Sequence, residues 1–134
     1  MRKITEIILH CSATEQGRVY HASDIDRWHR EQGWSGIGYH FVVLPDGSLE
    51  TGRPLQQPGA HCRGHNGCSV GVCYIGGLRG GFPADTRTPE QKRALRRLVK
   101  LLLQRFPDAK VYGHRDFNPH KACPCFDVRE MGFL

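Results

Sequence analysis

The chain has 134 residues, a length typical of one domain, and two separate hydrophobic cores would be hard to fit into it. Its hydrophobic fraction of 39% and charged fraction of 24% are ordinary for a globular protein and argue against a disordered chain. The net charge of +6 favours an anionic partner such as nucleic acid, an acidic polysaccharide or a carboxylate-rich peptide. We therefore expect one domain spanning residues 1–134, with the class of partner left open by charge alone.

The N-terminal segment lacks the pattern of an export signal or a membrane anchor. Its only uninterrupted apolar run is Ile7–Leu9, whereas a signal-peptide core needs about 7–15 apolar residues and a membrane span about 20. We expect cytoplasmic synthesis, no membrane association and a separate release step before any action outside the cell. In a reducing compartment, the six cysteines are thiols or metal ligands rather than a disulfide framework, and most are expected to be small core residues.

Five segments have the hydrophobic pattern of strands. The first is rich in branched residues and ends in His10-Cys11, while two others flank the turn Pro45-Asp46-Gly47 and predict a β-hairpin. The predicted strands are residues 4–9, 39–44, 48–51, 69–75 and 110–113.

Two segments have the signals of helices. Ser23, with Asp26 as its capping-box partner, predicts the start of a short helix that ends at Gly33. Thr88 predicts the N-cap of a long helix, which has Pro89 and Gln91 in its first turn and ends before Pro107. The long helix has an apolar face made of Leu95, Val99, Leu102 and Phe106, widened by Ala94, Leu98, Leu101 and Leu103. Strands interleaved with helices predict an α/β (α+β-like) domain with a central mixed sheet flanked by helices.

Two histidines and a cysteine stand where a fold commonly places reactive groups, at strand ends and in loops. His10 closes the first predicted strand, His114 follows the last, and Cys123 comes nine residues later. A hydrolytic zinc site typically uses three nitrogen, sulfur or oxygen ligands and leaves a fourth position for water. These three residues supply such a set if the two strands are neighbours. Cys125 is an alternative to Cys123.

Four motifs in register resemble one family. The motifs are IILHCSAT, GIGYHFVVLPDGSLETGR, GAHCRGHNGCSVGVCYIGG and GHRDFNPHKACPCFDV, and the resemblance runs from about Ile4 to Val128. They resemble the zinc-dependent N-acetylmuramoyl-L-alanine amidases of type 2, which share a fold with phage amidase-type lysozymes and peptidoglycan recognition proteins. The resemblance implies hydrolysis, by a zinc-bound water, of the amide bond between N-acetylmuramic acid and L-alanine in peptidoglycan. A non-catalytic module that binds muropeptides is the alternative.

The resemblance also implies roles for individual residues. The matched ligands of one Zn²⁺ are His10, His114 and Cys123. Tyr39 matches a tyrosine beside the metal and Lys121 an active-site lysine, and a phenol and an ammonium both suit stabilisation of the oxyanion that forms during amide hydrolysis. His61 and Asn66 match positions that face the peptide-binding groove.

Two departures from the family pattern bear on the site. The stretch between His114 and Lys121 is one residue longer than in the phage enzymes, and Cys125 stands where relatives usually carry a small residue such as serine.

Trp28 and Trp34 are candidates for stacking on a sugar ring, with burial the favoured interpretation of Trp28. The expected partner is peptidoglycan or a muropeptide bound by a monomer. Nucleic acid is not expected, since only the net charge favours it.

Overall fold

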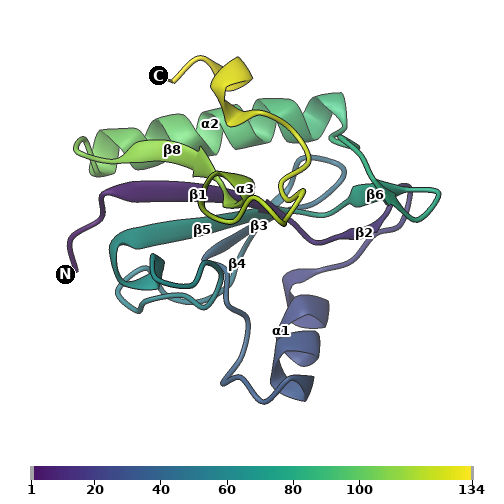
Figure 1. The fold of residues 1–134 in the computed structure, drawn as a ribbon, viewed down its shortest axis with the longest axis horizontal. Coiled ribbons are helices and arrows are strands. Elements are labelled where there is room, and N and C mark those ends of the chain that lie inside the picture. The colour runs from purple at the N-terminus through teal and green to yellow at the C-terminus, as the bar shows by residue number, and fades with distance from the viewer. Residues whose placement is uncertain (1, 134) are drawn as a thin grey trace.

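A five-stranded mixed sheet forms the centre of the structure, a computed structural model that describes residues 2–133 (Figure 1). Its strands, in spatial order, are β4 (Leu49–Thr51), β3 (Phe41–Val43), β5 (Ser69–Tyr74), β1 (Glu6–Cys11) and β8 (Lys110–Gly113). The four strands from β3 to β8 run parallel, and β4 pairs antiparallel with β3 in the expected hairpin. The predicted mixed sheet is confirmed.

Two helices cover opposite faces of this sheet (Figure 1). Helix α2 (Pro89–Arg105) buries Leu95 and Val99 against the face that carries Ile7 and Leu9, and helix α1 (Ala22–Glu31) packs Ile25 on the other face. Because side chains alternate along a strand, the even-numbered residues of β1 point away from α2. His10 therefore points to the face of the sheet opposite α2.

The remaining elements are short and lie around the ends of the sheet. They are a second, three-stranded sheet of β2 (Thr14–Glu15), β6 (Gly77–Arg79) and β7 (Phe82–Pro83), the helix α3 (His114–Phe117), and the 3-10 turns η1 (Asn66–Cys68) and η2 (Val128–Met131). Within residues 2–133, none of the helices has the length and apolar character needed to cross a membrane.

Helix α2 begins with the predicted capping box. The Thr88 hydroxyl accepts a hydrogen bond from the Gln91 N–H, and the Gln91 side-chain oxygen accepts one from the Thr88 N–H, both at 3.0 Å. Gln91 is fully buried, and its amide nitrogen also donates to the carbonyl oxygens of Val43 (3.3 Å) and Ile75 (2.9 Å). The start of the helix is thereby tied to the carboxyl ends of β3 and β5.

Two helix predictions are wrong. The N-cap of α1 is His21 rather than Ser23, because Glu50 on β4 accepts hydrogen bonds from the Ala22 N–H (2.7 Å) and the His21 ring (2.9 Å). This contact links residues far apart in the sequence. Leu101 does not join the apolar face of α2: it lies at the margin of that face, about 100° around the helix from its buried neighbour Leu102, and is 57% exposed.

Candidate functional site

The pairing of β1 with β8 brings two histidines side by side. The strands run parallel with Leu9 opposite Gly113, so the next residues, His10 near the end of β1 and His114 directly after β8, lie at the same end of the sheet. The centroids of the two imidazole rings lie 4.7 Å apart. His10 is fully buried and His114 is half-buried, which places the pair between the sheet and solvent.

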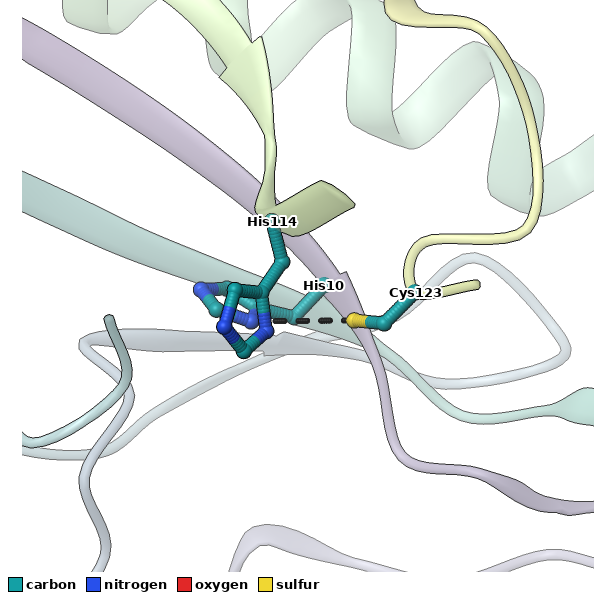
Figure 2. Close-up of side chains that lie close together, drawn as sticks. All are labelled: His10, His114 and Cys123. Carbon is teal, nitrogen blue, oxygen red and sulfur yellow. Dashed lines mark hydrogen bonds between the residues drawn. The ribbon is translucent and has the colours of Figure 1, made fainter. Parts of the chain in front are cut away.

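Cys123 completes a cluster with these histidines (Figure 2). Its Sγ lies 3.7 Å from Nδ1 of His10 and accepts a hydrogen bond from the Cys11 N–H at 3.2 Å. One ligand atom from each of His10, His114 and Cys123 falls within 4.8 Å of the other two. A tetrahedral zinc ion with bonds of about 2.0–2.3 Å holds its ligand atoms roughly 3.3–3.7 Å apart. The cluster therefore fits one such ion after a small contraction.

Cys125 lies apart from this cluster. Its Sγ is 3.8 Å from the Cys11 Sγ and 3.5 Å from the Gly77 carbonyl oxygen. Burial, together with the nearby Cys11 thiol, raises the pKa of Cys125 to about 12, so the group stays a neutral thiol. Of the two candidate cysteines, the structure brings Cys123 to the histidines.

His61 holds the ring of His10 from the side opposite Cys123. Nε2 of His10 and Nδ1 of His61 share a hydrogen bond of 2.8 Å, and Nε2 of His61 lies 3.2 Å from the Ser69 hydroxyl. Metal-binding histidines typically use their second ring nitrogen in this way, which fixes the orientation of the ring. Gly71 makes the arrangement possible, because a Cβ there would lie 2.6 Å from the His61 ring.

A cavity of about 480 Å³ opens beside the cluster, a size within the usual range for ligand pockets. It is lined by Trp34, Tyr39, Ala60, His61, Cys62, Arg63, Asn66 and His114. His61 and Asn66, both expected to face a groove, are in the lining. The Asn66 side-chain oxygen also accepts hydrogen bonds from the N–H groups of His61 (2.9 Å) and Cys62 (3.0 Å), which shapes the pocket wall.

The two tryptophans differ in their surroundings. Trp34 is 40% exposed and lines the cavity. Trp28 instead packs edge-on to Tyr20, with ring centroids 5.1 Å apart, beside the core cluster under α1. Only Trp34 is therefore placed to meet a ligand.

Tyr39 lies beside the histidines with its hydroxyl protonated. It precedes β3, which begins at Phe41, so the prediction of a strand from residue 39 is too long. The Tyr39 ring centroid is 5.0 Å from that of His10. Burial, followed by the nearby thiols of Cys73 and Cys123, raises the pKa of Tyr39 well above its usual value. The phenol therefore remains a hydrogen-bond donor at neutral pH.

Lys121 lies outside the cavity and affects the site only through its positive charge. Its side chain is exposed and is not part of the cavity lining. The pKa of His114 is lowered first by burial and second by the positive charge of Lys121.

Two further histidines, which the sequence did not single out, support the site. Nδ1 of His29 accepts a hydrogen bond from the Gly38 N–H at 2.9 Å, and its ring lies 5.6 Å from that of Tyr39. Nδ1 of His40 accepts a hydrogen bond from the Gly71 N–H at 3.0 Å. Both anchor the backbone around the cavity, and no spacing rule in the sequence signals these long-range contacts.

Replacing Gly71 with alanine should displace His61. The new methyl group would overlap the imidazole, and overpacking of this kind typically costs about 1–3 kcal/mol in the free energy of unfolding. Gly67→Ala is the matched control, because a Cβ there meets nothing within 4 Å. Urea unfolding and zinc titration should show lower stability and weaker zinc binding in Gly71→Ala alone. Parent-like values in both variants would contradict the role of Gly71.

The metal-free protein should lose stability as the pH falls below about 6.5. Burial lowers the pKa of His61 from 6.5 to about 3 and also lowers that of His10, so the unfolded chain binds protons that the folded chain does not. Each such histidine removes about 1.4 kcal/mol per pH unit in this window. Urea unfolding in chelator should therefore show a smaller pH slope for His61→Gln, and a parent slope for the exposed-site control His120→Gln. Equal slopes in all three proteins would refute the effect.

Comparison with known proteins shows the family of the chain. The profile of the family described as N-acetylmuramoyl-L-alanine amidase matches residues 1–126. The endolysin of Escherichia phage T7 is 42% identical over 125 residues, covering 92% of this chain and 82% of the relative. The endolysin of Klebsiella phage KP32 is 41% identical over 129 residues, covering 96% and 85%.

A solved structure extends the likeness to the fold. The N-acetylmuramoyl-L-alanine amidase LysC from Clostridium intestinale URNW superposes with a TM-score of 0.84 at 28% identity, covering 97% of this chain and 83% of that one. The resemblance and the fold expected from the motifs are confirmed. The chain belongs to the N-acetylmuramoyl-L-alanine amidase family.

Proposed function

We propose that this chain hydrolyses the amide bond between N-acetylmuramic acid and L-alanine in peptidoglycan, with one Zn²⁺ held by His10, His114 and Cys123. The observation that carries the proposal is the convergence of their three ligand atoms within 4.8 Å, next to a cavity of about 480 Å³. Two imidazoles and a thiolate are a ligand set that zinc prefers. Burial lowers the pKa of both histidines and so favours the neutral rings that a metal needs.

The protein groups around the cluster each have a separate role in amide hydrolysis. A bound zinc ion would supply Lewis acidity to the scissile carbonyl and to the attacking water. Tyr39 stays protonated and donates a hydrogen bond to the negative charge that develops on the carbonyl oxygen. Lys121 adds positive charge from the solvent side. His61 keeps the His10 ring oriented through the 2.8 Å hydrogen bond.

The cavity supplies recognition of the substrate. Trp34 exposes a ring on which the sugar can lie, and the loop around Asn66 offers a polar wall for the stem peptide. A binding module without catalysis would need this cavity but not the ligand cluster beside it. The cluster therefore favours hydrolysis over binding alone. The endolysin relatives support action on the cell wall. That the chain acts there as a monomer, after a separate release step, is part of the proposal.

Alanine at any one of the three proposed ligands should abolish activity and zinc binding together. Two remaining protein ligands hold a zinc ion much more weakly than three, and without the ion the other two ligand side chains lose their shared partner. The matched control is Cys125→Ser, which alters the thiol that lies apart from the cluster. Zinc affinity of this site and clearing of a cell-wall suspension should both be lost in His10→Ala, His114→Ala and Cys123→Ala and kept in Cys125→Ser. Activity retained in the three ligand variants would refute the assignment.

Tyr39→Phe and Lys121→Ala should keep zinc but slow turnover. Removing one hydrogen-bond donor to a developing oxyanion typically lowers the rate about 100- to 1000-fold, which is the loss expected of Tyr39→Phe. Lys121→Ala removes only a positive charge outside the cavity lining and should have a smaller effect on the rate. Tyr112→Phe on β8 and Lys92→Ala on α2 are the matched controls. Release of free stem peptide, measured by mass spectrometry, reports turnover, and the zinc content of the same samples shows whether the metal is kept. Parent rates in both Tyr39→Phe and Lys121→Ala would remove these residues from the mechanism.

A further inference from the structure

We propose that the chain has a second metal site, formed by Glu6, His65 and Cys68, which binds a divalent transition-metal ion such as Zn²⁺. One ligand atom from each of these residues lies within 4.8 Å of the other two. The site is distinct from the cluster of His10, His114 and Cys123 and does not depend on the proposed amidase mechanism.

The geometry of this second cluster is close to that of a bound ion. Oε1 of Glu6 lies 2.9 Å from Nδ1 of His65 and 3.3 Å from Sγ of Cys68. A tetrahedral zinc ion separates its ligand atoms by roughly 3.3–3.7 Å. All three ligand atoms lie within 4.8 Å of one another, so a shift of the His65 ring away from Glu6 would bring the shortest separation to that of a bound ion.

The ligand types and their exposure also suit a metal. Carboxylate, imidazole and thiolate are all ligands of zinc, and three protein ligands leave one position for solvent. The side chains of Glu6 and His65 are 15% and 31% exposed, which gives an ion a route from solution. On binding, the thiol proton of Cys68 passes to solvent and the sulfur electron pair bonds to the metal.

The charge balance around Glu6 favours a cation. In the part of the chain that the structure describes, the Glu6 carboxylate forms no ion pair with lysine or arginine, and its only ionic contact is with His65. That contact neutralises the carboxylate only when His65 is protonated. A divalent ion would balance the charges of Glu6 and Cys68 with a neutral imidazole.

The position of the site gives it a structural consequence. His65 precedes the turn η1 and Cys68 ends it, and η1 also contains Asn66 of the cavity lining, whereas Glu6 begins β1. The His65 ring also stacks on Phe117 of α3, with centroids 3.9 Å apart. An ion here would brace the cavity wall against the strand that carries His10 and the helix that begins at His114.

Zinc stoichiometry tests the second site directly. Purified parent protein, loaded with zinc and dialysed against metal-free buffer, should retain two equivalents by elemental analysis. Cys68→Ser and His65→Gln should each retain one equivalent and keep amidase activity, and the control His120→Gln should retain two. Cys123→Ala should retain one equivalent without activity. Cys68→Ser and His65→Gln remove different ligands of the same site, so a folding defect in one variant does not affect the result from the other.

Cobalt provides a second readout. In cobalt-loaded Cys123→Ala, a thiolate-to-cobalt charge-transfer band should remain, and it should disappear when Cys68→Ser is added. A single retained equivalent in the parent that is lost in Cys123→Ala but kept in Cys68→Ser would overturn the second site and leave the proposed function intact. A single retained equivalent in the parent that is lost in Cys68→Ser but kept in Cys123→Ala would support the second site and refute the proposed function.

Discussion

The parallel register between β1 and β8 is the constraint on which the site depends. Because Leu9 lies opposite Gly113, His10 and His114 emerge together, although more than a hundred residues separate them in the sequence. The same alternation that sends Ile7 and Leu9 into the core against α2 sends His10 to the other face. A slip of one residue in β1 would exchange these faces and destroy the core and the cluster at once. Core packing therefore fixes the geometry of the proposed metal site.

Burial prepares the electrostatics of the site. The low pKa of His10 and His61 follows mainly from loss of hydration, and a neutral imidazole can offer a lone pair to a metal. The same loss of hydration keeps the Tyr39 phenol protonated as a donor. These polar groups are accommodated by specific contacts, chiefly the hydrogen bond between His10 and His61 and the space left by Gly71. The arrangement is preorganised, so little rearrangement is needed when a cation binds.

The sequence predicted the features that arise from local rules. The capping box of Thr88 and Gln91 uses contacts three residues apart, and the two histidines were recognised because His10 closes one predicted strand and His114 follows another. Features set by distant contacts were missed or left open. Glu50 moves the start of α1, and the bond between His61 and His10 joins residues that no periodicity connects. The residues alone left Cys125 open beside Cys123, because both lie in an irregular loop to which strand alternation does not apply, and only the family resemblance favoured Cys123.

Anomalous diffraction from a zinc-loaded crystal of the parent protein, recorded on both sides of the zinc absorption edge, tests the central claim most directly. The account predicts a peak bonded to Nδ1 of His10, to a ring nitrogen of His114 and to Sγ of Cys123, with one position open toward the cavity. An empty position between these atoms at saturating zinc, or an ion held by Cys125 in place of Cys123, would contradict it.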